Sequence, residues 1–355
     1  MLFLPPPNAK ILIVGEAPGE QEEMTGLPFM GHAGQMLTQE LKAAGIDRAD
    51  CALTNVFDIR PKDNNLAAFN VPRSEWLALS AEFPLARKRK NMGKDLWPRP
   101  ELVEASLKRL ANEIALVKPN LILALGNTAL WALTGSLGIT KLRGTITFGD
   151  LAPDVKILPT FHPASIFRQW SNRPILAADL QKAQRESASA SLNRTKRLLW
   201  LRPTCEDLRV FEKQHIAKHD GPLSVDVETP TNTVACIGLS RHPSEALVLP
   251  FLDRTRSDWN YWRTFSEERF AYLWLKRILE DFTIPKLFQN GLFDIQHFFR
   301  MGIRVRAATE DTMLMHHSMY SSMNKGLGFL GSIYVDEIAW KLLRPRHNNV
   351  EKKDE

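Results

Sequence analysis

The stretch Gly15-Glu16-Ala17-Pro18-Gly19-Glu20 decides the fold of the first half of this chain, because it directly follows the apolar run Ile11-Leu12-Ile13-Val14. Four consecutive aliphatic residues predict a buried strand. The turn after this strand contains glycine and proline and carries carboxylates. Ligands in open α/β sheets bind at the carboxyl ends of strands, so we expect the turn to form part of a site. The alternative is an ordinary turn between a strand and a helix.

Helical and extended patterns alternate beyond this turn. Apolar residues spaced three and four apart predict a helix between Pro100 and Pro119, namely Val103, Leu107, Leu110, Ile114 and Val117. Strands are expected at 51–57, 121–125 and 156–161. This alternation predicts an α/β domain with a parallel sheet over residues 1–185. The proline- and lysine-rich residues 62–98 interrupt it, and we interpret them as a long surface insertion.

Composition and charge narrow the class of protein. The chain has 355 residues, which suggests two domains, and a net charge of +6, which is compatible with DNA as a partner. One basic cluster consists of Arg87, Lys88, Arg89 and Lys90. This cluster predicts contact with DNA phosphates, and a solvated surface without such a role is the alternative.

The sequence also excludes several locations for the protein. It has no apolar run near 18 residues, so no membrane association is expected, and its first residues lack the pattern of a signal peptide. The three cysteines, Cys51, Cys205 and Cys236, are far apart and give no disulfide framework. A reducing cytoplasm is the expected location, which would be the host's if a phage encodes the chain.

Polar side chains follow the predicted strands of the first half. Glu16 comes after the first strand, Asn55 ends the second, and His162 ends the last. Glu22 and Phe29 lie shortly after the acidic turn. Each of these residues alone has a structural explanation, since Asn often ends a strand and Phe is usually part of a core. Because the carboxyl ends of parallel strands lie at one edge of a sheet, we expect the set to form one site.

Five motifs in this region occur together and in order. They are Gly-Glu-Ala-Pro-Gly-Glu from Gly15, Gly-x-Pro-Phe-x-Gly-x-Ala-Gly-Gln from Gly26, Thr-Asn-x-x-x-x-Arg-Pro from Thr54, Leu-x-Leu-Gly from Leu123 and His-Pro-Ala from His162. Together they resemble the uracil-DNA glycosylase superfamily, in particular its family 4, over residues 10–185. The resemblance implies a DNA N-glycosylase that hydrolyses the N-glycosidic bond of uracil in DNA.

The resemblance also assigns roles to the polar set. Glu16 would position the attacking water, and His162 would donate a hydrogen bond to the uracil oxygen as it becomes an oxyanion. Asn55 would bind the uracil edge through its amide donor and acceptor. Phe29 would stack on the flipped base, and Glu22 would guard the pocket against the thymine methyl.

Residues outside the base pocket are implied to contact DNA. Ile166 and Phe167 would wedge into the duplex as the base leaves, and Arg168 would contact phosphate. Family 4 enzymes also carry four cysteines that bind an iron–sulfur cluster, and this chain lacks them at the expected positions. We therefore expect no cofactor for the glycosylase, with the insertion 62–98 replacing the cluster's structural role.

Residues 186–197 are small and polar and are expected to link this domain to a second α/β domain at 198–342. Asp226 and Glu228 alternate along one predicted strand, so their carboxylates share a face. Asp294 opens a later helix in the motif Asn-x-x-Phe-Asp. The set resembles the 3′–5′ exonuclease domain of family A DNA polymerases, which implies a ribonuclease H-like fold. These three carboxylates are implied to bind Mg²⁺.

The second domain departs from this family at its end. The fourth carboxylate of the family sits in Tyr-x-x-x-Asp, whereas here Asp336 follows Tyr334 too closely and Asp311 lies elsewhere. We therefore expect a truncated exonuclease domain, a charged tail at 343–355, and a DNA polymerase chain as a partner that completes the site. An inert domain that only holds DNA is the alternative. For the whole chain, the competing interpretation is a non-catalytic DNA-binding or processivity module of a split phage polymerase.

Overall fold

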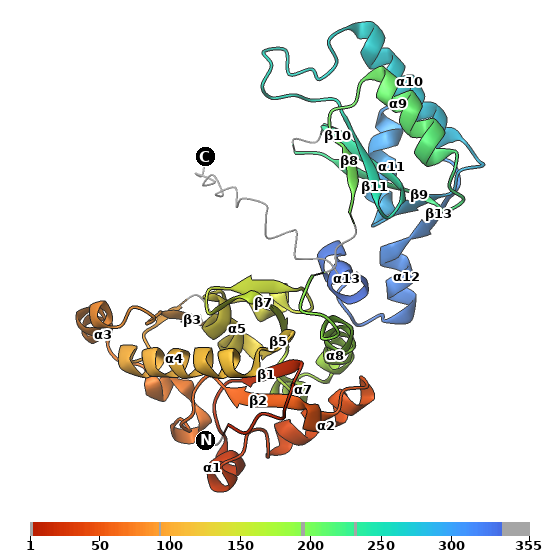
Figure 1. Ribbon diagram of the computed structural model, residues 1–355. Coiled ribbons are helices and arrows are strands. Elements are labelled where there is room, and N and C mark those ends of the chain that lie inside the picture. The colour runs from red at the N-terminus through yellow and green to blue at the C-terminus, as the bar shows by residue number, and fades with distance from the viewer. Residues whose placement is uncertain (1–2, 92–93, 193–195, 231–232, 336–355) are drawn as a thin grey trace. The chain divides into compact units, whose positions relative to one another are not determined.

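The computed structural model describes residues 3–335 except 92–93, 193–195 and 231–232, and the side chains of 90, 91 and 94 also lie outside its description. The described residues form two compact units. The first holds those of 1–193 together with those from Gly328 onward, and the second holds those of 194–327. Both units are α/β (Figure 1).

The sheet of the first unit has the strand order β2-β1-β5-β7-β6. The four strands from β2 to β7 are parallel, as the sequence predicts, and β6 adds an antiparallel edge. The strands are β1 (Ile11–Gly15), β2 (Cys51–Asn55), β5 (Leu121–Leu125), β6 (Thr147–Gly149) and β7 (Ala152–Thr160). All five residues of β1 are buried, because β1 lies between two other strands and both faces of the sheet are covered.

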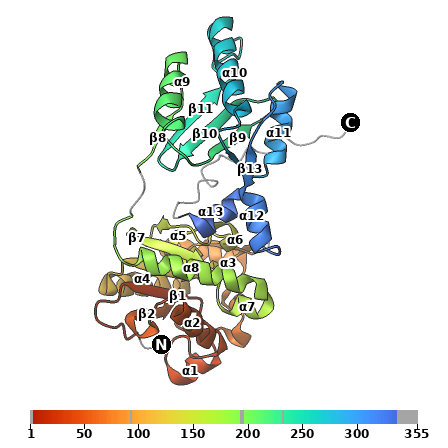
Figure 2. The same ribbon diagram turned by 90° about the vertical axis from the view of Figure 1, so that its right-hand side faces the viewer.

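Alternate residues of β1 enter two different cores. Leu12 and Val14 pack with the apolar side of α4 (Pro100–Val117) and with α5 (Gly126–Thr134). Ile11 and Ile13 pack on the other face with α2 (His32–Ala43) and α8 (Arg173–Glu186), and Figure 2 shows α8 across this side of the sheet. The period of two in a strand produces this division, so a continuous apolar run serves both cores.

The remaining helices of the first unit are short. They include α1 (Glu20–Thr25), α3 (Arg73–Leu79), α6 (Ile139–Leu142) and α7 (Ala164–Arg168). The predicted insertion at 62–98 contains α3 and an antiparallel hairpin of β3 (Arg89–Asn91) and β4 (Lys94–Leu96). It is not purely a surface feature, since Phe69 and Val71 are buried. Its apolar side chains anchor it on the core that α4 covers.

The second unit has a six-stranded sheet with the order β13-β12-β9-β10-β11-β8. Its strands are β8 (Leu198–Trp200), β9 (Leu223–Glu228), β10 (Cys236–His242), β11 (Glu245–Pro250), β12 (Lys286–Phe288) and β13 (Ala308–Asp311). The strand β10 is antiparallel to its neighbours β9 and β11, while β12 and β13 continue parallel to β9. This is the strand arrangement of the ribonuclease H-like fold, which confirms the expected fold class.

One core fills the second unit. It joins Leu223, Val225 and Val227 of β9 to three helices, namely α9 (Cys205–Phe211), α10 (Phe265–Glu280) and α11 (Gly291–Arg300). The helix α12 (Thr312–Met319) follows β13. Because side chains alternate along β9, Asp226 and Glu228 lie on the face opposite to these three apolar residues.

The helix α13 (Leu327–Tyr334) differs from the sequence-based assignment, which placed it in the second domain. From Gly328 onward it packs with the first unit. The buried Lys182 of α8 donates hydrogen bonds to the carbonyls of Ser332 and Val335, at 3.0 and 2.8 Å. The second unit is therefore inserted in the chain between two parts of the first. The predicted tail at 343–355 lies outside the described residues.

The helices that the structure describes include none that is long and apolar enough to cross a membrane.

Candidate functional site

The carboxyl ends of three parallel strands bring the predicted polar set of the first unit together. Glu16 follows β1, Asn55 is the last residue of the neighbouring β2, and His162 comes two residues after β7. The backbone holds the first two ends in register, since the amide of Phe57 donates to the carbonyl of Glu16 at 3.0 Å. The three residues therefore lie at one edge of the sheet, and their role as one site stays a prediction.

Gly15 leaves space for the side chains of Asn55 and Phe29 to approach each other. A Cβ atom at this position would overlap the Asn55 amide oxygen and would lie 2.6 Å from Cζ of Phe29. The Asn55 amide and the Phe29 ring therefore lie side by side above the end of β1. Only glycine leaves room for both, so the glycine of the first motif shapes the site sterically.

His162 faces Phe29 across this space. The two rings are 6.4 Å apart between centroids and inclined by 29°. Nδ1 of His162 accepts a hydrogen bond from the backbone amide of Ala164 at 3.2 Å. A neutral imidazole has one donor and one acceptor nitrogen, so this bond places the proton on Nε2. His162 is thus arranged to donate from Nε2.

The electrostatic surroundings favour the neutral form of this ring. Burial lowers the pKa of His162 below its ordinary value, and the positive charge of Arg168 acts in the same direction. The carboxylates of Glu16 and Glu22 oppose this shift. At neutral pH the ring is therefore an uncharged donor.

Glu22 organises the backbone around Phe29. Its carboxylate accepts hydrogen bonds from the amides of Gly19, Met30 and Gly31 at 2.8 to 3.0 Å. These bonds tie the acidic turn to the loop that carries Phe29. The structure thus gives Glu22 an anchoring position, and its implied contact with a thymine methyl stays a prediction.

Arg48 is a second anchor of the Phe29 loop, although no motif in the sequence indicates it. Its guanidinium donates to the carbonyls of Pro28 and Phe29 at 3.0 and 3.1 Å. Phe29 has a φ of 57°, a left-handed conformation that is unfavourable for an aromatic residue. The bonds from Arg48 hold the backbone in this conformation and present the ring to the site.

A network around Arg109 lies behind Asn55 and was also missed. Arg109 donates to the carbonyls of Asn55 and Val56 at 2.6 and 2.9 Å, and it pairs with Glu113 one turn along α4. Thr54 donates to the same Glu113 at 2.7 Å. The only signal in the sequence was the four-residue spacing of Arg109 and Glu113. This network fixes the end of β2, where Asn55 must be oriented.

The predicted metal ligands of the second unit are Asp226, Glu228 and Asp294. Oδ1 of the buried Asp294 accepts a hydrogen bond from the amide of Val227, between Asp226 and Glu228, at 2.9 Å. Burial raises the pKa of Asp294 to about 6, and the charge of Asp226 adds to the shift, while the bond from Val227 opposes it. Among the described residues, no three acidic, histidine or cysteine side chains stand close enough to hold a metal ion. In this structure Asp226, Glu228 and Asp294 are therefore not gathered into a metal-binding cluster, and Mg²⁺ binding by them stays a prediction.

One of the two substitutes considered for the fourth carboxylate, Asp311, is engaged by backbone amides. Asp311 accepts hydrogen bonds from the backbone amides of Asn290, Gly291, Met313 and Leu314. Burial raises its pKa, but these four bonds outweigh burial and leave the pKa below its ordinary value. Asp311 therefore caps α11 and α12. Asp336 lies outside the described residues.

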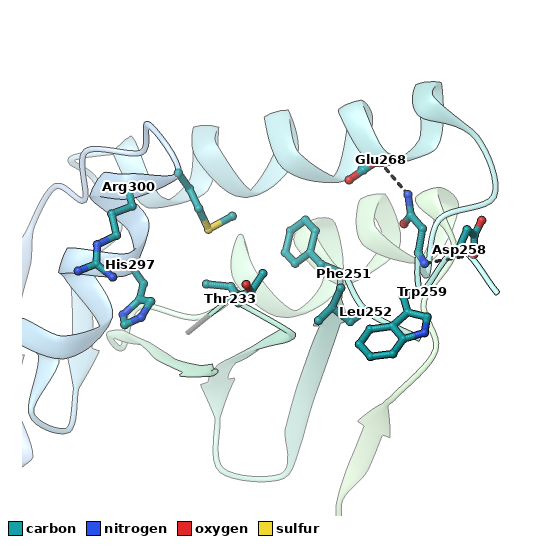
Figure 3. Close-up of a pocket in the computed structure, with 11 residues that line it drawn as sticks. Thr233, Phe251, Leu252, Asp258, Trp259, Glu268, His297 and Arg300 are labelled. Carbon is teal, nitrogen blue, oxygen red and sulfur yellow. Dashed lines mark hydrogen bonds between the residues drawn. The ribbon is translucent and has the colours of Figure 1, made fainter. Parts of the chain in front are cut away.

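A cavity of about 490 Å³ in the second unit lies apart from these carboxylates. Figure 3 shows His297 and Arg300 of α11 on one side of it and Asp258 and Trp259 on the other. None of Asp226, Glu228 and Asp294 lines it. The cavity therefore does not coincide with the predicted catalytic carboxylates.

Comparison with known proteins identifies the family of the first unit. A family model described as the uracil DNA glycosylase superfamily matches residues 2–188, which is more than half of the chain. The chain belongs to the uracil-DNA glycosylase superfamily. A type-4 uracil-DNA glycosylase of Thermotoga maritima is 35% identical over 181 residues, which make up 50% of this chain and 77% of that enzyme. The predicted class, a DNA N-glycosylase, is confirmed at the level of the family.

Other similarities extend beyond the glycosylases. A DNA polymerase of Bacillus phage SP01 is 25% identical over 175 residues, which cover 49% of this chain and only 15% of the polymerase. The crystal structure of the EXD2 exonuclease domain soaked in Mg and dGMP matches with a TM-score of 0.26 at 14% identity. That match covers 44% of this chain and 78% of the other.

The cysteines of this superfamily member do not fit an iron–sulfur cluster. Such a cluster is held by up to four thiolates, and the chain has three cysteines, of which only Cys51 belongs to the glycosylase unit. Cys51 is buried in β2, and burial raises the pKa of its thiol to about 12. A thiol that resists deprotonation is a poor metal ligand.

The predicted wedge into the duplex requires a correction. Ile166 is fully buried in the core of the glycosylase unit and cannot enter DNA. Successive residues of α7 point in different directions, so Phe167 is 56% exposed. Trp170, which the sequence analysis did not select, is 60% exposed and lies under the guanidinium of Arg173. Phe167 and Trp170 are thus the exposed aromatic side chains of the segment 164–170, and a contact with DNA stays a prediction.

The predicted phosphate cluster makes contacts within the chain at three of its four positions. Arg87 pairs with Asp150 at 3.2 Å, and Lys88 pairs with Asp95 at 3.3 Å. Arg89 is directed inward and donates to Thr128 at 3.0 Å. The Lys90 side chain lies outside the description. Arg87, Lys88 and Arg89 thus have partners within the chain, and the contact of the cluster with DNA phosphates stays a prediction.

This arrangement predicts how salt affects DNA binding. Replacing Arg168 with alanine is expected to reduce the slope of log K against log salt by about 0.9, because one phosphate contact is lost. Arg87→Ala is the matched control and is expected to leave the slope unchanged, since Arg87 pairs with Asp150. Duplex binding is measured by fluorescence anisotropy between low and moderate salt. An equal loss of slope in both variants would restore the basic cluster as a DNA contact.

Proposed function

We propose that the first unit hydrolyses the N-glycosidic bond of uracil in DNA. The observation that carries the proposal is the convergence of Asn55, Phe29 and His162 at one edge of the sheet, with Nε2 of His162 as an available donor. The type-4 relatives are consistent with this chemistry.

His162 assists departure of the base. Cleavage leaves negative charge on the uracil ring, and a donor already oriented toward the developing oxyanion stabilises the transition state more than the ground state. The amide of Ala164 fixes the tautomer. Since the ring is uncharged, it donates a hydrogen bond without having to supply a full proton.

Recognition of the base comes from Asn55 and Phe29. The Asn55 amide offers a donor and an acceptor to the uracil edge, and the Phe29 ring offers a face for stacking. Glu22 and Arg48 hold the Phe29 loop, so the stacking surface exists before DNA binds. Preorganisation of this kind lowers the cost of ordering the pocket around a flipped base.

Glu16 provides the carboxylate for the sugar side of the reaction. Its position after β1 suits it to orient a water molecule and to stabilise the positive charge that develops on the sugar. Oε2 accepts a hydrogen bond from Thr128, so Oε1 is the oxygen assigned to water.

The test is excision from uracil-containing DNA. The purified full chain is expected to leave alkali-labile abasic sites in single- or double-stranded oligonucleotides that contain uracil, and none where thymine replaces it. A chain that binds both oligonucleotides equally and cleaves neither after alkali treatment would favour the processivity module.

Iron content is a further prediction, which the donor set motivates. The purified protein is expected to contain no stoichiometric iron and to lack visible thiolate-to-iron absorption, because four cysteine ligands are not available. Elemental analysis and a spectrum of anaerobically purified protein check this result. A type-4 glycosylase prepared in parallel is the positive control. Iron in the amount of one iron–sulfur cluster per chain would contradict the prediction.

For the second unit we propose DNA holding rather than efficient cleavage, with a DNA polymerase chain as the partner. The carboxylates of Asp226, Glu228 and Asp294 do not form a metal cluster, and Asp311 is occupied as a cap. Digestion of a labelled single strand with Mg²⁺ or Mn²⁺ is expected to be very slow. Rapid digestion that disappears in Asp226→Ala would contradict this prediction and show that the site is complete.

A further inference from the structure

Arg89 is partly buried in the first unit although it belongs to a run of basic residues. Its Nη2 donates to Oγ1 of Thr128 at 3.0 Å, and its guanidinium lies over the Trp131 ring, 5.3 Å from the centroid. Burial lowers the pKa of Arg89, with the negative charge of Glu16 opposing the shift. An arginine remains charged under such conditions, so a cation is held close to Glu16.

Thr128 connects the Arg89 guanidinium to the Glu16 carboxylate through two hydrogen bonds. Its hydroxyl donates to Oε2 of Glu16 in addition to accepting from Arg89. A hydroxyl has one proton, whereas arginine can only donate. The bond from Arg89 therefore fixes the direction of the second bond, so that the Thr128 proton points at Glu16.

The geometry points to Arg89 as a positioning residue for Glu16 that acts through Thr128. This inference rests on the proposed glycosylase function and deepens it. Arg89 orients the hydroxyl, the hydroxyl holds one carboxylate oxygen, and the second oxygen is left for the attacking water. The hairpin of β3 and β4 thereby contributes to the active site from within the segment 62–98, through an arginine rather than a metal cluster.

Two other roles for Arg89 would change different measured quantities. A phosphate contact would affect DNA affinity and its salt dependence. A purely structural contact with Trp131 would affect thermal stability and would not depend on Thr128. A positioning role instead affects the chemical step alone, because poor alignment of a reacting group slows the reaction without weakening substrate binding.

The experiment separates chemistry from binding in the full chain. Single-turnover excision is measured for Arg89→Ala, Thr128→Val, Thr128→Ser and the double variant R89A/T128V. Affinity is measured with an oligonucleotide whose uridine carries a non-hydrolysable 2′-fluorine. Arg87→Ala is the matched control, since Arg87 precedes the same hairpin but pairs with Asp150. Thermal midpoints are recorded for every variant.

We expect Arg89→Ala and Thr128→Val to lower the excision rate by about 10- to 100-fold with affinity unchanged. Thr128→Ser should retain the rate, and the double variant should lose no more than the slower single variant, as residues of one relay do. If Arg89→Ala does not fold, the nearly isosteric Thr128→Val still tests the relay. An active wild type whose Arg89→Ala and Arg87→Ala rates are equal would overturn this inference alone, whereas an inactive wild type would overturn the proposed function.

Discussion

His162→Ala is expected to lower the rate of uracil excision by about 10²- to 10³-fold, which is the usual loss when one preorganised donor to an oxyanion is removed. The wild-type ring holds its donor nitrogen in place through the bond from the Ala164 amide to Nδ1. Alanine removes this donor and half of the ring pair with Phe29. The rate is measured under single-turnover conditions, with DNA affinity measured separately.

The pH profile of the wild type distinguishes a neutral donor from a general acid. Because burial lowers the pKa of His162, the ring is already mostly neutral at the ordinary histidine pKa of about 6.5 and stays neutral above it. The rate should therefore not fall as pH rises through this value. A loss of activity that follows histidine deprotonation there would indicate an imidazolium acid instead. His32→Ala, which alters an exposed histidine of α2, is the control.

Asp179→Ala is expected to destabilise the protein by about 3–5 kcal/mol, since it leaves a buried arginine without its counter-ion. The side chains of Arg143 and Asp179 are only 2% and 1% exposed, and Thr160 also donates to Asp179 at 2.6 Å. For a unit of this size the loss corresponds to a thermal midpoint lower by about 6–20 °C. Differential scanning calorimetry gives the measurement.

Two further variants test whether the expected loss of stability comes from the buried ion pair. Asp150→Ala breaks the pair with Arg87, in which Asp150 is 64% exposed, and should cost at most about 1 kcal/mol. The double variant R143M/D179L replaces both buried charges with apolar groups and should recover much of the loss. Equal midpoints for Asp179→Ala and Asp150→Ala would show that the buried pair does not stabilise the fold.

Much of the secondary structure of the first unit could be predicted because the sequence patterns that indicate it are local. The apolar run of β1 reflects a strand that is buried at every residue, and the three-and-four spacing of α4 reflects a helix with one buried face. Glu16, Asn55 and His162 could be grouped because parallel strands present their carboxyl ends at one edge. The contact of Phe29 with His162 follows from that rule and from the loop after α1.

What could not be predicted depends on contacts between distant residues. Arg89 and Thr128 are 39 positions apart, and nothing in either local pattern shows that one points at the other. Ile166 and Phe167 are adjacent and both apolar, so only the orientation of α7 decides which is buried. The pairing of α13 with Lys182 spans 150 residues and has no signature in the sequence.

The docking of α13 on the first unit gives the chain two covalent connections between its units. A single proteolytic cut between α8 and β8 would therefore not separate the protein into independent pieces. The C-terminal fragment would still carry α13, which the amino group of Lys182 and the guanidinium of Arg143 bind at Ser332. A nicked protein should run as two bands in denaturing gels yet elute as one species in size-exclusion chromatography, so limited proteolysis alone would underestimate how firmly the halves are joined.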